Sequence, residues 1–176
     1  MLYFFDQDIM NENYSKLLHY ALDYCDTITL RIRNYIKSLD GEKYFWSNDK
    51  ESEERFKEHF YKVSQLTKEL FGEHIVKIEH SAQYGAEFCG HENEIYTIAF
   101  NMQVIEKLLV AQSLFSWQGE LPEDLCLFSK GKCWIESIAH EHMCYINDDS
   151  EELKALLREM NIDFINPNED IIEDEK

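Results

Sequence analysis

The pattern of apolar and polar residues between positions 125 and 146 restricts the fold of this chain more than any other sequence feature. Three short apolar runs, "LCLFSK", "CWIESIA" and "MCYI", are separated only by a turn at Gly131 and by the segment 140–142. Such short connections join antiparallel strands, because a parallel connection needs a crossover of a dozen or more residues. The sequence therefore predicts a C-terminal meander of three antiparallel strands.

Apolar residues that recur at helical spacing predict four helices around this meander. Asparagine, serine and aspartate are favoured at helix starts, because their side chains accept hydrogen bonds from the first free backbone N–H groups. On this basis helices are expected from Asn11 or Asn13, over residues 49–71 and 101–115, and from Asp149 or Ser150 onward. Gly72 is expected to end the long helix in a left-handed conformation.

Three further strands are expected in the first hundred residues. Strict alternation predicts a half-buried strand at 27–33, and apolar runs predict strands at 74–80 and 94–100. Strands and helices do not alternate strictly along the chain, so a doubly wound parallel sheet is excluded. We expect an α+β fold: a mostly antiparallel sheet covered by about four helices, in which a final helix follows the meander.

The chain is expected to form one domain. Its 176 residues contain no internal repeat and no linker rich in Pro, Gly or Ser, and a chain of this length can bury roughly 70% of its unfolded surface. The expected domain covers residues 1–166, and an acidic, frayed tail covers 167–176.

The net charge of −18 is unevenly distributed along the sequence. Residues 1–80 carry 15 acids and 11 bases, whereas residues 81–176 carry 20 acids and 6 bases. Such a surface repels phosphate backbones and anionic lipid, and it accelerates encounters with basic partners. We therefore expect a basic protein as partner and no direct binding to nucleic acid or membrane. The alternative is that the acidity only keeps the protein soluble.

Cysteine usage and the N-terminus favour a cytoplasmic location. The five cysteines form an odd set without a CxxC pair, which suits neither a disulfide framework nor a zinc ribbon. The start "MLYFFDQDIM" lacks the basic and long apolar regions of a signal peptide. No stretch approaches the 18 apolar residues of a membrane span.

The segment "HEH" at 140–142 is the most conspicuous candidate for chemistry. One hypothesis is a metal site, in which Cys89, His91, His140 and His142 supply the ligands. A second is a nucleophilic thiol, Cys144 or Cys133, paired with His140. The blander interpretation is a polar turn between two strands, with Glu141 in solvent and one histidine bound to the backbone.

Other candidate features favour structure over catalysis. No glycine-rich phosphate-binding motif is present, so no cofactor is expected. Arg31 and Arg33 form an exposed basic row with Lys37 nearby, and this row either binds an anion or pairs with the protein's own acids. The aromatic segment 44–46 either packs on the core or forms a recognition patch. Glu123 and Asp124 are expected to fix a turn.

No residue is predicted to be catalytic, and the candidate partner-binding residues are carboxylates on two expected loops, 81–94 and 116–124. Loops are preferred because they are exposed and commonly carry binding residues. The six candidates are Glu87, Glu92, Glu94, Glu120, Glu123 and Asp124.

Two stretches resemble a pattern found in many small bacterial proteins of unassigned function. One is "LFSWQGELPEDLCLFSKGKCWIESIAHE" (114–141), and the other is "LDYCDTITLRIRNY" (22–35). Some proteins of this kind look like immunity proteins, which are small acidic cytoplasmic inhibitors of toxins. The resemblance covers about a quarter of the chain and assigns no catalytic residue.

Three hypotheses about function follow. The first is a non-enzymatic acidic binding protein, of the immunity type, that docks on a basic protein surface. The second is a metal-dependent enzyme or sensor, and the third is a regulatory protein whose partner is not basic.

Overall fold

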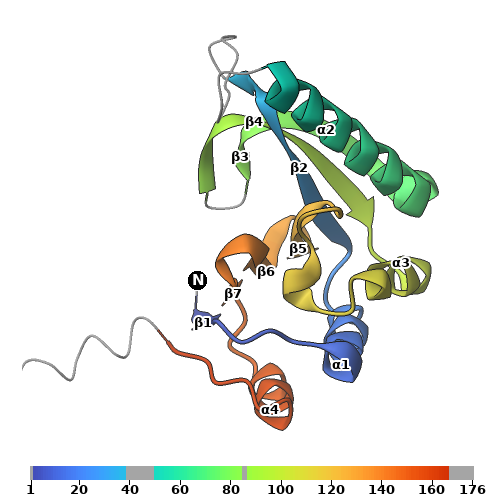
Figure 1. Cartoon of the computed structure of the whole chain (residues 1–176). Coiled ribbons are helices and arrows are strands. Elements are labelled where there is room, and N and C mark those ends of the chain that lie inside the picture. Colours follow the sequence, from blue (N-terminus) through green and yellow to red (C-terminus); the bar gives the residue numbers. More distant parts are fainter. Residues whose placement is uncertain (1, 39–49, 85–86, 167–176) are drawn as a thin grey trace, which may run out of the picture.

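A computed structural model of the chain describes residues 2–38, 50–84 and 87–166. It has an α+β fold, as the sequence predicts, built on one antiparallel sheet (Figure 1). Its strands are β1 (Tyr3–Phe5), β2 (Thr27–Ser38), β3 (Ile75–Tyr84), β4 (Glu87–Ala99), β5 (Glu123–Ser129), β6 (Lys132–Ile138) and β7 (Met143–Ile146). Its α-helices are α1 (Asn11–Ala21), α2 (Lys50–Phe71), α3 (Met102–Leu108) and α4 (Glu151–Glu159).

The seven strands lie in the order β1-β7-β6-β5-β2-β4-β3. The predicted meander is confirmed, since β5, β6 and β7 pair in sequence. The long strand β2 pairs with β5 on one side and with β4 on the other. It therefore joins the meander to the β3–β4 hairpin.

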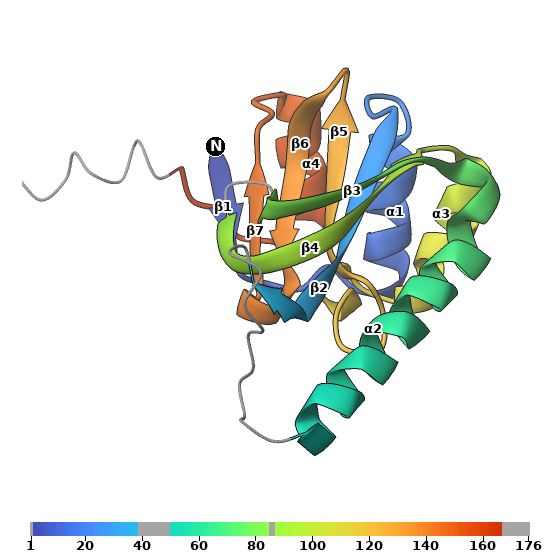
Figure 2. The ribbon, with the colours of Figure 1, turned by 90° about the horizontal axis from the view of Figure 1, so that it is seen from above.

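The sheet is strongly coiled, and this decides which of its residues are buried. Seen from above, the β3–β4 hairpin crosses over the meander instead of continuing its plane (Figure 2). A small apolar cluster of Tyr84, Ile95 and Cys126 fills the space between the hairpin and β5. Strand twist of a fixed hand accumulates across a sheet and produces such coiling.

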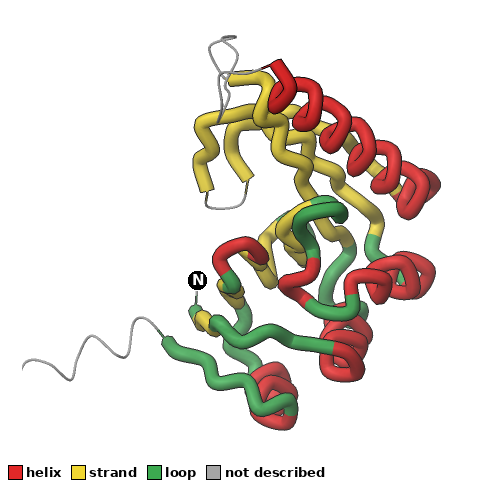
Figure 3. Tube along the Cα trace, in the orientation of Figure 1, coloured by secondary structure: helices red, strands yellow, loops and turns green. Residues whose placement is uncertain are grey.

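The opposite face of the sheet carries the main core. Alternation places Ile28, Leu30 and Ile32 of β2 on this face, where α1, α2, α3 and α4 contribute further apolar side chains. Figure 3 shows the helices gathered beside the strands. Trp117 is fully buried there, and its indole N–H donates to the Tyr14 hydroxyl at 2.7 Å. A satisfied indole N–H lets a large aromatic side chain fill the core without an unpaired donor.

Several expected boundaries are wrong for local reasons. The expected loop 81–94 is largely the β3–β4 hairpin. The expected helix 101–115 ends at Leu108, because the chain tightens into a 3₁₀ turn and Gln112 takes a left-handed conformation. Gly72 does not adopt the left-handed conformation but starts a 3₁₀ helix. The apolar run at 162–165, after α4, forms only an isolated bridge, between Phe4 and Ile165.

Helix starts test the capping prediction in three places. The Ser150 side chain accepts from Leu153 N at the start of α4, and the Asn101 side chain accepts from Val104 N at the start of α3, as predicted. The helix α1 begins at Asn11, as predicted, but the predicted asparagine cap is wrong, because the cap residue is Met10 and makes no side-chain hydrogen bond. The expected tail 167–176 and the aromatic segment 44–46 lie outside the described residues.

No helix within the described ranges combines the length and the apolar character needed to cross a bilayer.

Candidate functional site

Charged side chains from three separate segments converge where β5 begins. Arg31 and Arg33 come from β2, Glu123 and Asp124 from the start of β5, and His140 from the 3₁₀ turn Ala139–Glu141 that joins β6 to β7. We call these five residues the charge cluster. Antiparallel pairing of β2 with β5 brings Arg31 opposite Glu123 and so sets the cluster in place.

The centre of the charge cluster is a buried ion pair. The side chains of Arg31 and Asp124 are 0% and 1% exposed, and Arg31 Nε donates to Asp124 Oδ2 at 2.7 Å. The guanidinium carbon also lies 4.9 Å from the ring centroid of Tyr84, which covers it from β3. Two charges this deeply buried remain ionised only when they are paired and hydrogen-bonded.

Asp124 also ties three segments of backbone together. Its Oδ1 accepts from Ala139 N at 2.7 Å, its own N–H donates to the Trp117 carbonyl, and its carbonyl accepts from the Tyr84 hydroxyl at 2.5 Å. Its φ of 56° is left-handed, a conformation that aspartate and asparagine tolerate better than most residues. The predicted role in fixing a turn is therefore realised, but the turn belongs to the β6–β7 connection.

The surroundings of Asp124 alter its pKa. Burial alone raises that pKa, but the His140 imidazole, the Arg31 guanidinium and the Ala139 N–H together hold it below its usual range. Each of these three groups favours the carboxylate over the carboxylic acid. Asp124 is consequently a permanent anion at neutral pH.

Glu123 forms the outer half of the charge cluster. Its Oε2 lies 2.7 Å from Arg33 Nε, and its side chain is 17% exposed. Burial raises the pKa of Glu123, and Arg33 opposes this effect. Arg33 also donates from Nη2 to the His140 ring, whose nitrogens lie 2.9 and 3.0 Å away.

A pocket of about 520 Å³ opens beside the charge cluster. Glu123 reaches it from the cluster, the turn at Gly119 closes one side, and α2 forms the wall with Ser52, Arg55, Phe56 and His59. Because Asp124 and Arg31 are buried behind Glu123, Glu123 is the cluster carboxylate that a molecule in this pocket meets.

Glu123, Asp124 and His140 also resemble a metal site in their spacing, since one ligand atom of each lies within 4.8 Å of the others. The same carboxylates are already bound by two guanidinium groups. A divalent cation would stand beside these two positive charges and compete with them for the same oxygens. The donor set therefore suits a protein ion-pair network better than a metal ion.

The sequence hypotheses about His140 have different outcomes in the structure. The polar-turn interpretation of 140–142 is confirmed, with Glu141 exposed, although His140 contacts Arg33 and not the backbone. His142 lies apart and packs on the Phe115 ring at 5.6 Å. The side chains of Cys89 and His91 lie outside the described part, so the four-ligand metal hypothesis stays a prediction.

The thiol hypothesis finds little support around Cys144. This side chain is fully buried, and burial raises its pKa well above the usual range. A buried neutral thiol is a poor nucleophile. Among the described residues, the side chains that contact His140 are those of Arg33, Asp124 and Glu141, none of which is a thiol.

The six predicted partner-binding carboxylates do not form one exposed surface. The expectation of exposed loop carboxylates is wrong for Glu94 and Asp124, which are 8% and 1% exposed. Glu94 accepts a hydrogen bond from the Ser64 hydroxyl inside the sheet–helix interface, and Asp124 is buried against Arg31. Glu120 is exposed and pairs with Lys62, and Glu92 lies 3.7 Å from His80. The structure does not describe the side chain of Glu87.

The exposed basic row expected on β2 is likewise wrong, since Arg31 is buried and Arg33 is 12% exposed. Its predicted alternative, pairing with the protein's own acids, is confirmed. Tyr84 is the member of this site that the sequence does not indicate. Its contribution depends on the hairpin crossing over the sheet, and no local sequence pattern predicts that crossing.

Comparison with known proteins adds no assignment, because no family model matches the chain, and neither a curated protein nor a solved structure is significantly similar to it.

Proposed function

We propose that this chain is a non-enzymatic, acidic binding domain that docks on a basic surface of a partner protein, in the manner of an immunity-type inhibitor. The observation that carries the proposal is the internal neutralisation of the charge cluster. Two arginines there offset two carboxylates, so the cluster contributes nothing to the net charge of −18. The excess negative charge therefore belongs to the rest of the molecule.

Part of this excess gathers where the two terminal segments meet. β1 pairs with β7, and Phe4 bridges to Ile165. Lys16 of α1 reaches Glu159 of α4 at 3.0 Å. Figure 1 shows β1, α1 and α4 at the same end of the molecule. We call residues 2–26 together with 147–166 the acidic end.

The acidic end holds 11 acids and 3 bases, a net charge of −8. The long helix α2 differs, since it carries five acids and five bases. Negative charge is thus concentrated in space as well as in sequence. A concentrated charge steers an oppositely charged partner during diffusion and raises the association rate.

The test is association with a basic protein encoded beside this gene. We expect the association rate constant to fall by about tenfold between about 50 and 500 mM NaCl, because salt screens exposed charge. Replacing Glu152→Gln and Asp163→Asn in the acidic end should lower that rate constant several-fold at low salt. The matched pair Glu54→Gln and Glu58→Gln on α2 should leave it nearly unchanged.

Equal effects of the two variant pairs, or an association rate independent of salt, would count against the proposal. Absence of any complex with a basic neighbouring product would do so as well.

The metal-dependent alternative is retained for the spacing of Glu123, Asp124 and His140, and the four-ligand hypothesis stays a prediction beside it. Elemental analysis of protein purified without chelator decides it. Less than about a tenth of an equivalent of metal removes this alternative, because a functional site binds stoichiometrically. One equivalent that disappears in His140→Ala would establish it.

A further inference from the structure

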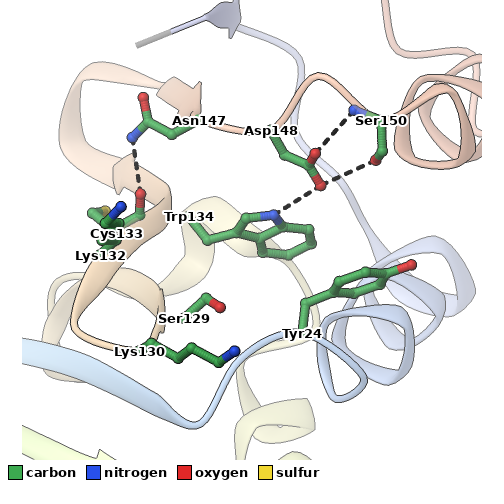
Figure 4. A pocket seen from close by; sticks show the side chains of 9 residues that line it. All are labelled: Tyr24, Ser129, Lys130, Lys132, Cys133, Trp134, Asn147, Asp148 and Ser150. Carbon is green, nitrogen blue, oxygen red and sulfur yellow. Dashed lines mark hydrogen bonds between the residues drawn. The ribbon is translucent and has the colours of Figure 1, made fainter.

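A second pocket lies at the opposite end of β5 from the charge cluster. It has a volume of about 380 Å³ and opens between the turn that joins β5 to β6 and the segment that joins β7 to α4 (Figure 4). This volume falls within the range of about 300–1,000 Å³ typical of small-molecule sites. Every side chain that lines it belongs to the described residues.

Aromatic rings form one wall of this pocket. The rings of Trp134 and Tyr24 are nearly parallel, at an interplanar angle of 13° with centroids 5.8 Å apart. Tyr20 packs behind Tyr24 at 4.9 Å. Trp134 is 6% exposed, whereas Tyr24 is 44% exposed and presents much of its ring to solvent. A planar molecule can stack on such a wall without any rearrangement of the core.

Hydrogen bonds hold this wall in position. The Trp134 indole N–H donates to Asp148 Oδ2 at 2.9 Å, and Asp148 also accepts from the Ser150 backbone N–H and hydroxyl. These bonds are visible in Figure 4. Because Asp148 is committed to three donors, its carboxylate serves to orient the indole. Asn147 fixes the neighbouring edge by donating to the Cys133 carbonyl.

Two lysines supply positive charge at the same pocket. Lys130 and Lys132 flank Gly131 in the turn, where Lys130 has φ 50° and Gly131 has φ 77°. Successive positive φ values describe a tight hairpin turn, and Asp26 Oδ2 anchors this turn by accepting from Lys130 N at 2.9 Å. In Figure 4 the Lys130 side chain extends below Trp134 toward Tyr24.

The placement of these lysines is unusual for this sequence. Residues 108–153 contain nine acids and only two bases, and both bases line this pocket. Within the described part of the chain, neither Lys130 nor Lys132 forms an ion pair with a carboxylate. The pocket therefore places two lysines that form no ion pair with a described carboxylate beside an aromatic wall in an otherwise acidic molecule, with Asp148 as the one carboxylate in its lining.

We propose that this pocket binds a planar aromatic anion of mononucleotide size or smaller. Its ring stacks on Tyr24, the exposed ring of the aromatic wall, which Trp134 backs, and its negative group contacts the ammonium groups of Lys130 and Lys132. A phosphate monoester and a carboxylate share this chemistry, because lysine recognises both as a point charge. The site does not depend on the function proposed above.

The experiment is a titration of the isotopically labelled full chain, followed by NMR. The probes are adenosine 5′-monophosphate and indole-3-carboxylate, and adenosine and indole are their neutral counterparts. We expect the Gly131 backbone signal and the Trp134 indole signal to shift, with Kd of about 1 mM or lower for an anionic probe. The neutral counterpart should bind about tenfold more weakly, since it lacks the contact with both lysines.

Variants separate this site from general attraction of anions. Lys130→Gln combined with Lys132→Gln should weaken binding about tenfold, and Tyr24→Leu should weaken it several-fold. Lys77→Gln, which alters an exposed lysine on β3, should leave Kd unchanged. Binding of either anionic probe supports the proposal and identifies the preferred group.

Three results would overturn the proposal. One is the absence of localised shifts with both anionic probes at about 10 mM, a concentration that detects even weak sites. Another is equal affinity for the neutral counterparts. The third is an equal loss of affinity in Lys77→Gln and in the double lysine variant.

Discussion

Replacement of Asp124 by asparagine is the sharpest test of how the charge cluster holds the fold together. Asparagine keeps the shape of the side chain and tolerates the left-handed backbone at this position. Its amide oxygen can accept one of the two hydrogen bonds, from Ala139 N or from Arg31 Nε. The guanidinium of Arg31 loses its buried counter-ion, and that is the main effect of the change.

The magnitude follows from the burial of both partners. Removing one member of a buried ion pair costs about 3–5 kcal/mol, because the other charge loses the partner that offset its burial. Arg31 keeps its contact with the Tyr84 ring, so the lower value, about 3 kcal/mol, is expected for Asp124→Asn. Arg31→Met combined with Asp124→Asn should cost less than Asp124→Asn alone, because the buried guanidinium is removed together with its partner.

Urea denaturation measures the loss in free energy of unfolding. The transition is followed by circular dichroism and by the fluorescence of the buried Trp117. With a denaturant slope of about 2 kcal/mol per M, the midpoint should fall by about 1.5 M for Asp124→Asn. Glu120→Gln breaks an exposed pair with Lys62 and should leave the midpoint unchanged within error. A loss below about 1 kcal/mol for Asp124→Asn, or strict additivity in the double variant, would refute the reasoning.

Three further predictions concern pH, helix capping and thiol reactivity. Because the pKa of Asp124 is lowered in the folded state, its stabilisation is present above the unfolded value of about 3.9 and is lost as pH falls through the lower folded value. The difference in urea midpoint between the parent protein and Asp124→Asn should therefore narrow as pH falls below about 4. Asn101→Ala should cost about 1 kcal/mol in urea unfolding by removing the cap on Val104 N, while the exposed Gln103→Ala changes little. Alkylation by iodoacetamide should reach half-buried Cys133 before Cys144, whose pKa is raised by burial; mass spectrometry showing rapid labelling of Cys144 in the folded protein would contradict this order.

The fold class follows from local patterns alone. Short polar turns between apolar runs require antiparallel strands, and helical spacing places α1, α2 and α4 close to their expected positions. Ser150 and Asn101 identify two helix starts because capping is a contact within a few residues. Such features are readable in one sequence because the groups that interact are near neighbours along the chain.

The site depends on contacts between segments that are distant along the chain, and a single sequence does not predict such contacts. Alternation puts Arg31 on the polar face of β2, where a single sequence predicts exposure. The coiled sheet brings the hairpin over that face, and Tyr84 and Asp124 then bury the guanidinium. Likewise, Lys130 and Trp134 look unrelated until the β5–β6 turn meets Tyr24 of the segment after α1.

The sequence by itself therefore determined the antiparallel α+β architecture, the excess of negative charge and the polar nature of the turn at 140–142. Only the tertiary structure decided that Arg31 and Asp124 neutralise each other in the interior and that two lysines meet an aromatic wall. The physical reason is that burial and ion pairing depend on which segments meet in space, whereas periodicity records only which side of its own strand or helix a residue occupies.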